Sequence, residues 1–422
     1  MTAAGYLVKE LARKVGKKES NLWGNCLSLP LHVTNYRLMQ PFQTRQIVAR
    51  IVLLIISWLI LNSVGLHSAR AAQFADDWKK DWEKTVEAAK KEGQVSVYMG
   101  GWGALLESGD FQKAYPQIKV VAVTGRGGEI AKRILAERRA GKFLADISSE
   151  GVGSNFRILH AAKSFDSIKA ALILPEVLDE SKWWQGKHRY VDPEGQFVFR
   201  YVGVPQFGNI SYNTKLVEPA EFKSYWDMLN PKWKGKIAIR DIRDPGPGNA
   251  PMRFFYHHPD IGPTFIKRLV GEMDVTLFRD FRQGVDWLAS GKFSLCFFCA
   301  DIDVAGAQGV PVSELGVLKE GGGLHTLYGT LSLLNKAPNP NAAKVFINWF
   351  LSRAGQVALQ RSLAKVKIEA PDSLRIDIPK DDLRAINRRA DGVSYLDLDS
   401  RPEWIDMKPI VNVFEAALEK RS

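Results

Sequence analysis

Polar and aromatic residues that follow short apolar runs are the part of this sequence best suited to chemistry. An arginine can pair with an anion through two parallel hydrogen bonds, a carboxylate can hold a cation, an asparagine can orient a polar solute, and a tryptophan can form an aromatic wall. These residue types predict noncovalent binding of a small molecule. The candidate binding residues are Gly101, Trp102, Arg126, Gly127, Glu150, Asn209, Asn249, Asp301 and Tyr328.

Three glycine-rich loops carry several of these residues: Met99–Gly103 (MGGWG), Thr124–Gly128 (TGRGG) and Ser148–Ser154 (SSEGVGS). Glycine-rich loops that open helices offer free backbone N–H groups, which suit an anionic group. The alternative is that the glycines only make tight turns. The TGRGG loop is not followed by Gly-Lys-Ser/Thr, so the sequence argues against nucleotide binding.

Two cysteines lie three positions apart, Cys296 and Cys299, in the apolar run Phe293–Ala300 (FSLCFFCA). In an oxidising compartment such a pair can form a disulfide or act in redox chemistry. The run is typical of a buried strand, so we expect two small buried hydrophobic side chains and leave the disulfide open. A remote alternative is an enzyme with one cysteine as nucleophile and Asp301 or Glu150 as base, but no histidine is near in the sequence. We therefore expect no catalysis.

Alternating strands and helices must position the first three loops. Strands are predicted at Gln94–Tyr98, Ile118–Val123 and Leu144–Ser148, with helices at 104–115 and 129–140 between them. This alternation predicts a parallel α/β sheet, whose ligands collect at the carboxyl ends of the strands.

A second set of strands and helices follows further along the chain. A strand is predicted at Lys236–Ile239, the amphipathic segment Phe278–Ser290 predicts a helix, and the cysteine strand ends at Asp301. The same rule places Asp301 and the loop Arg240–Asn249 at the edge where a ligand would bind.

The stretch from Val202 to Asp244 is predicted to cross between the two sets of elements. Its segments Tyr212–Leu216 (YNTKL), Trp226–Leu229 (WDML) and Pro231–Ile237 (PKWKGKI) resemble the solute-binding proteins of ABC importers, in particular the group that includes ferric-iron binders. The resemblance extends over about residues 82–360. It implies an α/β, two-lobed type II periplasmic binding fold with a ligand cleft between lobes joined by two crossover strands.

The resemblance also implies how the chain is divided. Residues 72–207 with 324–422 are expected to form the first lobe and 208–323 the second. The expected hinges are Val204–Gly208 and Leu324–Tyr328. The segment 373–422 matches the family less well, and its role is left open.

The function implied by the resemblance is capture of a small anionic or polar solute and its delivery to an inner-membrane permease with a cytoplasmic ATPase. A sensor in place of the permease is an alternative partner. The protein is expected to be a monomer without a cofactor. Ferric iron is an alternative ligand, but the adjacent tyrosine pair that family members use for iron is missing: Phe297–Asp301 (FFCAD) stands at the end of the strand.

The beginning of the chain predicts export. An apolar run at Ile51–Leu61 is shorter than a membrane-spanning helix, follows Arg45 and Arg50, and precedes Ala69-Arg70-Ala71. This order is typical of a secretory signal peptide, here residues 39–71, cleaved after Ala71. Residues 1–71 form the expected leader, with Met39 as the more natural start. The expected location is the periplasm.

Length and charge agree with this interpretation. A chain of 422 residues with 45% hydrophobic and 25% charged residues has the composition of a globular protein with two cores. The leader holds nine Lys or Arg and two Asp or Glu, so only +5 of the net charge of +12 belongs to the remainder. So small an excess argues against a nucleic-acid partner.

Overall fold

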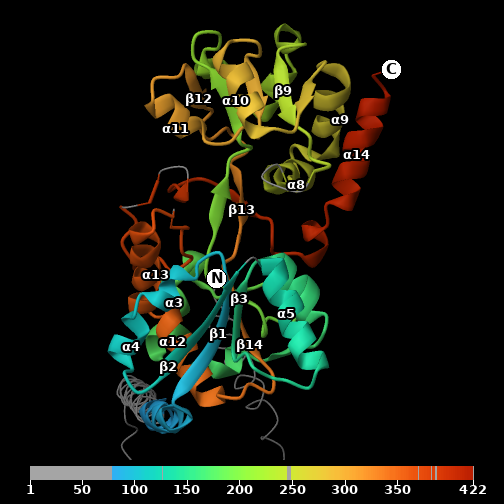
Figure 1. Ribbon diagram of the computed structural model, residues 1–422. Coiled ribbons are helices and arrows are strands. Elements are labelled where there is room, and N and C mark those ends of the chain that lie inside the picture. The colour runs from blue at the N-terminus through green and yellow to red at the C-terminus, as the bar shows by residue number, and fades with distance from the viewer. Residues whose placement is uncertain are drawn as a thin grey trace, which may run out of the picture. The chain divides into compact units, whose positions relative to one another are not determined.

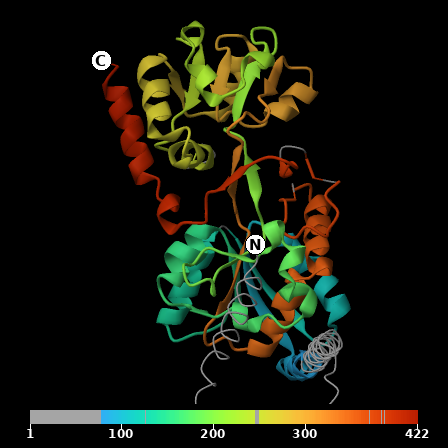
Figure 2. The same ribbon diagram turned by 180° about the vertical axis from the view of Figure 1, so that it is seen from behind.

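The computed structural model describes residues 78–125, 127–244, 249–368, 370–381, 383–384 and 387–421 (Figures 1 and 2). The predicted leader with its start at Met39 and its cleavage site, the residue Arg126 and the side chain of Asn249 lie outside the described residues. Among the described helices, none is long and apolar enough to cross a membrane.

A seven-stranded mixed sheet forms the first lobe. Its order is β2-β1-β3-β14-β6-β5, with β4 paired to β14, and β2, β1 and β3 are parallel. The predicted parallel sheet with intervening helices is therefore confirmed. The strands are β1 (Gln94–Gly100), β2 (Lys119–Gly125), β3 (Ile147–Glu150), β4 (Phe165–Asp166), β5 (Arg189–Tyr190), β6 (Phe199–Arg200) and β14 (Thr330–Leu334).

Helices cover both faces of this sheet (Figure 1). Alternate residues of a strand point to opposite faces, and Val95 and Val97 of β1 pack with helix α12 (Pro340–Leu351) while Tyr98 packs with α5 (Gly127–Arg139). The single helix predicted for 104–115 is instead two, α3 (Ala104–Glu107) and α4 (Asp110–Ala114), separated at Gly109, which has a left-handed backbone with φ of 73°.

A five-stranded sheet forms the second lobe, in the order β10-β9-β11-β8-β12. The order matches β2-β1-β3-β14-β6 of the first lobe, since β10, β9 and β11 are parallel and β8 is antiparallel to β11. In each lobe the antiparallel strand is the one that follows a crossover. The strands are β8 (Ile210–Asn213), β9 (Ile237–Arg240), β10 (Thr276–Phe278), β11 (Leu295–Phe297) and β12 (Val312–Glu314).

Strand β9 divides the core of the second lobe in the same way. Ile237 and Ile239 pack with one set of helices, whereas Ala238 faces the other set. The first set is α8 (Asn249–His257), α9 (Gly262–Glu272) and α14 (Lys408–Glu419), and the second is α10 (Phe281–Ala289) and α11 (Ile302–Ala307).

The two crossover segments pair with each other. Strands β7 (Val204–Gln206) and β13 (Gly322–His325) are antiparallel, and β15 (Tyr395–Asp397) adds a third strand parallel to β13. These strands overlap the segments expected to be hinges, at Val204–Gln206 and at Leu324 and His325, and their hinge role stays a prediction. The third strand was not foreseen, because its partner lies some 70 residues earlier in the chain.

The C-terminal segment, residues 353–421, contributes to both lobes. Helix α13 (Arg353–Lys365) packs with α12 in the first lobe, whereas Leu398, Ile410 and Phe414 belong to the core of the second. The expectation that the whole segment belongs to the first lobe is therefore wrong for its last part, because α14 packs against α9 of the second lobe.

Two carboxylates of this segment form buried ion pairs. Asp397 accepts from Arg189 at 2.9 Å and from Arg200 at 2.6 Å, both from the first lobe. Asp399 accepts from Arg253 of α8 at 2.8 Å and from the backbone N–H of Thr326 at 2.8 Å. The segment therefore links each lobe to the crossover.

A long helix over residues 78–92 precedes β1. The remaining elements are short: α6 (Val152–Ser154), α7 (Pro175–Leu178), the π-helical turn η1 (Asn155–His160), and the 3-10 segments η2 (Lys169–Ala171), η3 (Glu180–Lys182), η4 (Trp184–Gly186), η5 (Pro219–Glu221), η6 (Tyr225–Leu229), η7 (Pro231–Trp233) and η9 (Pro402–Ile405).

Candidate ligand-binding site

Two glycines at the carboxyl end of β1 make the backbone accessible to side chains from other strands. A Cβ on Gly100 would overlap the carboxylate of Glu150, and a Cβ on Gly101 would overlap the ring of Tyr328. Gly101 also has a left-handed φ of 72°, which favours glycine. The glycines of the MGGWG loop thus allow the side chains of Glu150 and Tyr328 to approach the backbone closely, and Gly101 also makes a turn.

Glu150, at the end of β3, is the most unusual side chain of this cluster. It is 0% exposed, and neither carboxylate oxygen has a hydrogen-bond partner among the described residues. Burial raises its pKa to about 8, and the nearby backbone of Gly100 offsets only part of that rise. The backbone is well held, because Thr330 donates to the Glu150 carbonyl oxygen at 2.6 Å.

Three aromatic rings belong to the same cluster, since the charge of Glu150 acts on Tyr201 and the ring of Tyr328 lies against Gly101, next to Gly100. Trp102 is 4% exposed and meets Tyr201 and Tyr328 edge to face, with ring centroids 6.0 and 5.9 Å apart. The Tyr201 hydroxyl lies 2.9 Å from the Ser149 hydroxyl. Tyr328 is 40% exposed and therefore faces solvent at the edge of the cluster.

The structure thus brings together four sequence-predicted residues, Gly101, Trp102, Glu150 and Tyr328. Tyr201 was missed, although it directly follows the strand Phe199–Arg200, and that position at a strand end could have signalled it. Gly127 begins α5, two positions after β2 ends. The role of the TGRGG loop in anion binding stays a prediction.

A cavity of about 210 Å³ lies in the second lobe beside the crossover, and two further sequence-predicted residues line it, Asn209 and Asp301. Phe207, Asp303 and Glu314 also line it. Sequence reasoning missed these three, since Asp303 lies inside a short helix and Glu314 on an edge strand. None of the four clustered first-lobe residues lines this cavity. The sequence-predicted residues therefore form two separate groups.

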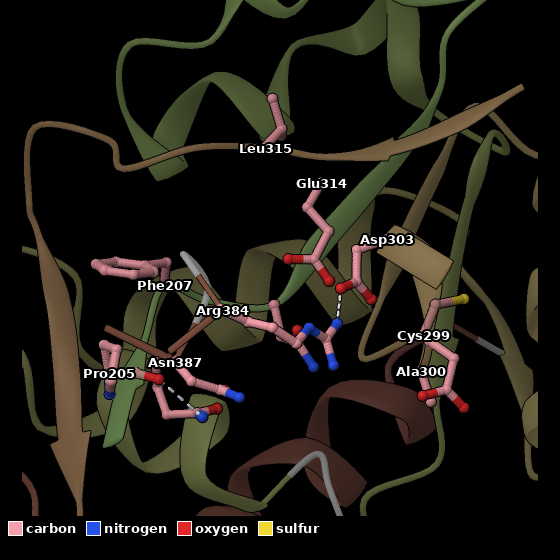
Figure 3. Close-up of a pocket in the computed structure, with 12 residues that line it drawn as sticks. Pro205, Phe207, Cys299, Ala300, Asp303, Glu314, Leu315, Arg384 and Asn387 are labelled. Carbon is pink, nitrogen blue, oxygen red and sulfur yellow. Dashed lines mark hydrogen bonds and ion pairs between the residues drawn. The ribbon is translucent and has the colours of Figure 1, made fainter. Parts of the chain in front are cut away.

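Carboxylates dominate the charge of this cavity (Figure 3). Figure 3 shows Asp303 and Glu314 turned towards the guanidinium of Arg384, which comes from the C-terminal segment, and Asp303 forms an ion pair with it. Burial raises the pKa of Glu314 to about 7. The charged groups that line the cavity are therefore three carboxyl groups and one guanidinium, which is already paired with Asp303.

Cys299, which lines the same cavity, is oxidised together with Cys296. Cys296 and Cys299 form a disulfide with Cα atoms 5.9 Å apart, and both residues are 0% exposed. The expectation of two unlinked hydrophobic side chains is therefore wrong. A positive φ of 68° at Phe298 turns the chain and brings the two residues together. The alternative of a cysteine nucleophile fails, because no free thiol remains at these positions.

Replacing both cysteines by alanine is expected to lower the free energy of unfolding by about 2 kcal/mol, because even a short disulfide loop restricts the unfolded chain. Urea denaturation of the double variant and the parent protein measures the difference. As a check on the bond itself, iodoacetamide under denaturing conditions should label Cys296 and Cys299 only after reduction. Labelling of either residue without reductant would contradict the disulfide.

In the part of the chain that the structure describes, no group of three or more His, Cys, Asp or Glu side chains lies close enough together to hold a metal ion. The described residues instead form two sites rich in hydrogen-bond acceptors: the aromatic cluster around Glu150 and the cavity lined by Asp301, Asp303 and Glu314.

No protein-family model and no curated protein matches the chain. Several solved structures do. A putative extracellular solute-binding protein from Bordetella parapertussis is 16% identical with a TM-score of 0.54, over 78% of this chain and 98% of that chain. Apo FutA2 from Synechocystis PCC6803 is 16% identical with a TM-score of 0.52, over 77% and 98%. Trichodesmium IdiA (FutA), in complex with iron and citrate, is 16% identical with a TM-score of 0.54, over 77% and 99%. Together with the repeated strand order of its two lobes, these matches show that the chain has the two-lobed α/β fold of periplasmic solute-binding proteins.

Proposed function

We propose that this protein is the periplasmic solute-binding component of an ABC importer. The main observation behind this proposal is that both lobes place polar side chains suited to binding at the carboxyl ends of parallel strands: Glu150 as the last residue of β3 in the first lobe, and Asp301 shortly after β11 in the second. In doubly wound sheets, ligands bind at that edge. The fold of the solved solute-binding proteins supports the same conclusion.

In this proposal the protein acts without catalysis. A small polar solute binds between the lobes, and the closed form accumulates because the solute has higher affinity for it. The paired crossover strands β7 and β13 act as the hinge. The closed monomer then delivers the solute to an inner-membrane permease with a cytoplasmic ATPase.

The experiment that tests the proposal is a thermal-shift screen of the purified protein. The panel contains sugars, sugar phosphates, phosphonates, carboxylates, amines and ferric citrate. A solute that binds the native state at a hundred times its Kd adds about 2.7 kcal/mol of stability and raises the melting temperature by several degrees. A protein that no class of solute stabilises would contradict the proposal.

Ferric iron is a second candidate solute, because one solved neighbour is an iron-citrate complex. The adjacent tyrosine pair expected of family members that bind iron is absent from this sequence. The same screen separates the two candidates: a shift with ferric citrate but with no organic solute would favour iron.

A further inference from the structure

Glu150 is a buried side chain that the fold itself does not explain. Its carboxyl group is 0% exposed, and among the described residues no side chain hydrogen-bonds to either oxygen; only the nearby backbone of Gly100 stabilises its charge, while the groups around it satisfy one another. Burying a polar group without a hydrogen bond is costly. A solute that brings a donor to Glu150 would remove this cost.

Among the residues that the structure describes, no cationic side chain pairs with the carboxyl of Glu150. Ser149 and Tyr201 are hydrogen-bonded to each other, and Thr330 uses its hydroxyl on the Glu150 backbone. Burial and the Gly100 backbone alone account for its pKa, with no contribution from a charged side chain. The negative charge of Glu150 contributes in turn to the raised pKa of Tyr201.

The neighbouring aromatic rings favour a positive charge at the same place. Trp102 and Tyr328 lie edge to face, and the face of an aromatic ring attracts cations. A carboxylate in an aromatic cluster attracts an ammonium, amidinium or guanidinium group and repels an anion.

The second lobe offers independent support from its own cavity. Asp301, Asp303 and Glu314 line it, and among the described lining residues the positive charge comes from Arg384 alone. The guanidinium of Arg384 is paired with Asp303. The chain itself therefore shows which kind of group this cavity accepts.

We propose that the solute carries a protonated amine, amidine or guanidine, which donates hydrogen bonds to Glu150 beside the rings of Trp102 and Tyr328. The proposal rests on the proposed function and narrows the solute to organic cations. It departs from the anionic solute that the glycine loops suggest. Because Glu150 is fully covered, binding requires the loop at 326–329 to move, since Tyr328 packs on Gly101 and the Leu327 carbonyl on Gly151.

Shape-matched ligands test the charge of the solute directly. Benzamidine, benzamide and benzoate form one series, and 1,4-diaminobutane, 1,4-butanediol and succinate form another. In isothermal titration calorimetry, the cation of at least one series is expected to bind at least tenfold more tightly than its neutral match, and the anions are expected not to bind.

Matched variants then test the role of Glu150. Glu150→Gln keeps the shape and removes the charge, and should weaken binding of the cation at least tenfold. Glu107→Gln makes the same change at an exposed position of α3 and should leave the affinity unchanged. Circular dichroism confirms that both variants are folded.

Three outcomes would count against these ideas in different ways. Tighter binding of any anion or neutral solute of the wider panel than of every cation would overturn the inference and leave the solute-binding function intact. Cation binding that Glu150→Gln does not weaken would overturn the assignment to Glu150. Binding of no solute at all would overturn the proposed function itself.

Discussion

Replacing Asp399 by asparagine is expected to lower the free energy of unfolding by about 3 kcal/mol, as removal of one partner from a buried ion pair does. Asp399 is buried and accepts from Arg253 of the second lobe and from the Thr326 backbone in the crossover. Without the carboxylate, the 10% exposed side chain of Arg253 keeps its charge with no counterion at that position. Urea denaturation at pH 7, followed by far-ultraviolet circular dichroism, measures the loss.

The pH dependence of the same variant provides a second readout. Burial by itself would raise the pKa of Asp399, but the charges of Arg253 and Arg200 and the hydrogen bond from Arg253 lower it from 3.8 to about 2. A lowered pKa stabilises the folded state above the unfolded pKa, and this stabilisation is lost as the pH falls from about 4 to 2. The difference between the parent protein and Asp399→Asn should therefore shrink in acid.

The control is Asp391→Asn, which removes a charge from an exposed position of the same segment. It should change stability by less than about 0.5 kcal/mol. An equal loss in both variants would mean that the ion pair of Asp399 is not the cause. A loss specific to Asp399 would show that the C-terminal segment holds the second lobe to the crossover.

The repeating strand and helix units were predictable because the signal is local. Short apolar runs predicted β1 and β2 to within two residues at each end, whereas the strand predicted at Leu144–Ser148 overlaps β3 only at Ile147 and Ser148. The crossover was predictable as well, since its residues lie within one continuous stretch. The strand β15 and the packing of α14 on α9 were not, because each depends on partners far away in the sequence.

The sequence predicted where the candidate binding residues lie along the chain, but not which groups they contact in the folded protein. Strand ends identified Trp102 and Glu150, but no sequence pattern shows that the carboxyl of Glu150 lacks a hydrogen bond in the folded chain. The expectation of two unlinked cysteines was wrong for a related reason. In an extended strand, residues three apart are separated by about 10 Å, and only the turn at Phe298 shortens this distance to 5.9 Å.

Replacing Glu150 by glutamine is expected to stabilise the protein at pH 8 and to have little effect at pH 4.5. The folded chain holds a proton on Glu150 up to a pKa of about 8, whereas the unfolded chain releases it near 4.5. Because the folded state binds more protons in this range, stability falls as the pH rises from about 4.5 to 8. A shift of this size corresponds to about 5 kcal/mol in full, of which about 4 kcal/mol is reached by pH 8. Glutamine does not titrate and removes this loss.

Urea denaturation of the parent protein and Glu150→Gln at pH 4.5, 6, 7 and 8 measures the difference, with Glu107→Gln as the exposed control. Tyr201 does not confuse the result, since burial raises its pKa far above this range. A difference that stays constant from pH 4.5 to 8 would mean that Glu150 titrates like an exposed carboxyl. The same variant links stability to binding: a cation that pairs with ionised Glu150 should stabilise the parent protein at pH 8 and reduce the advantage of glutamine. A solute that binds elsewhere would leave that advantage unchanged.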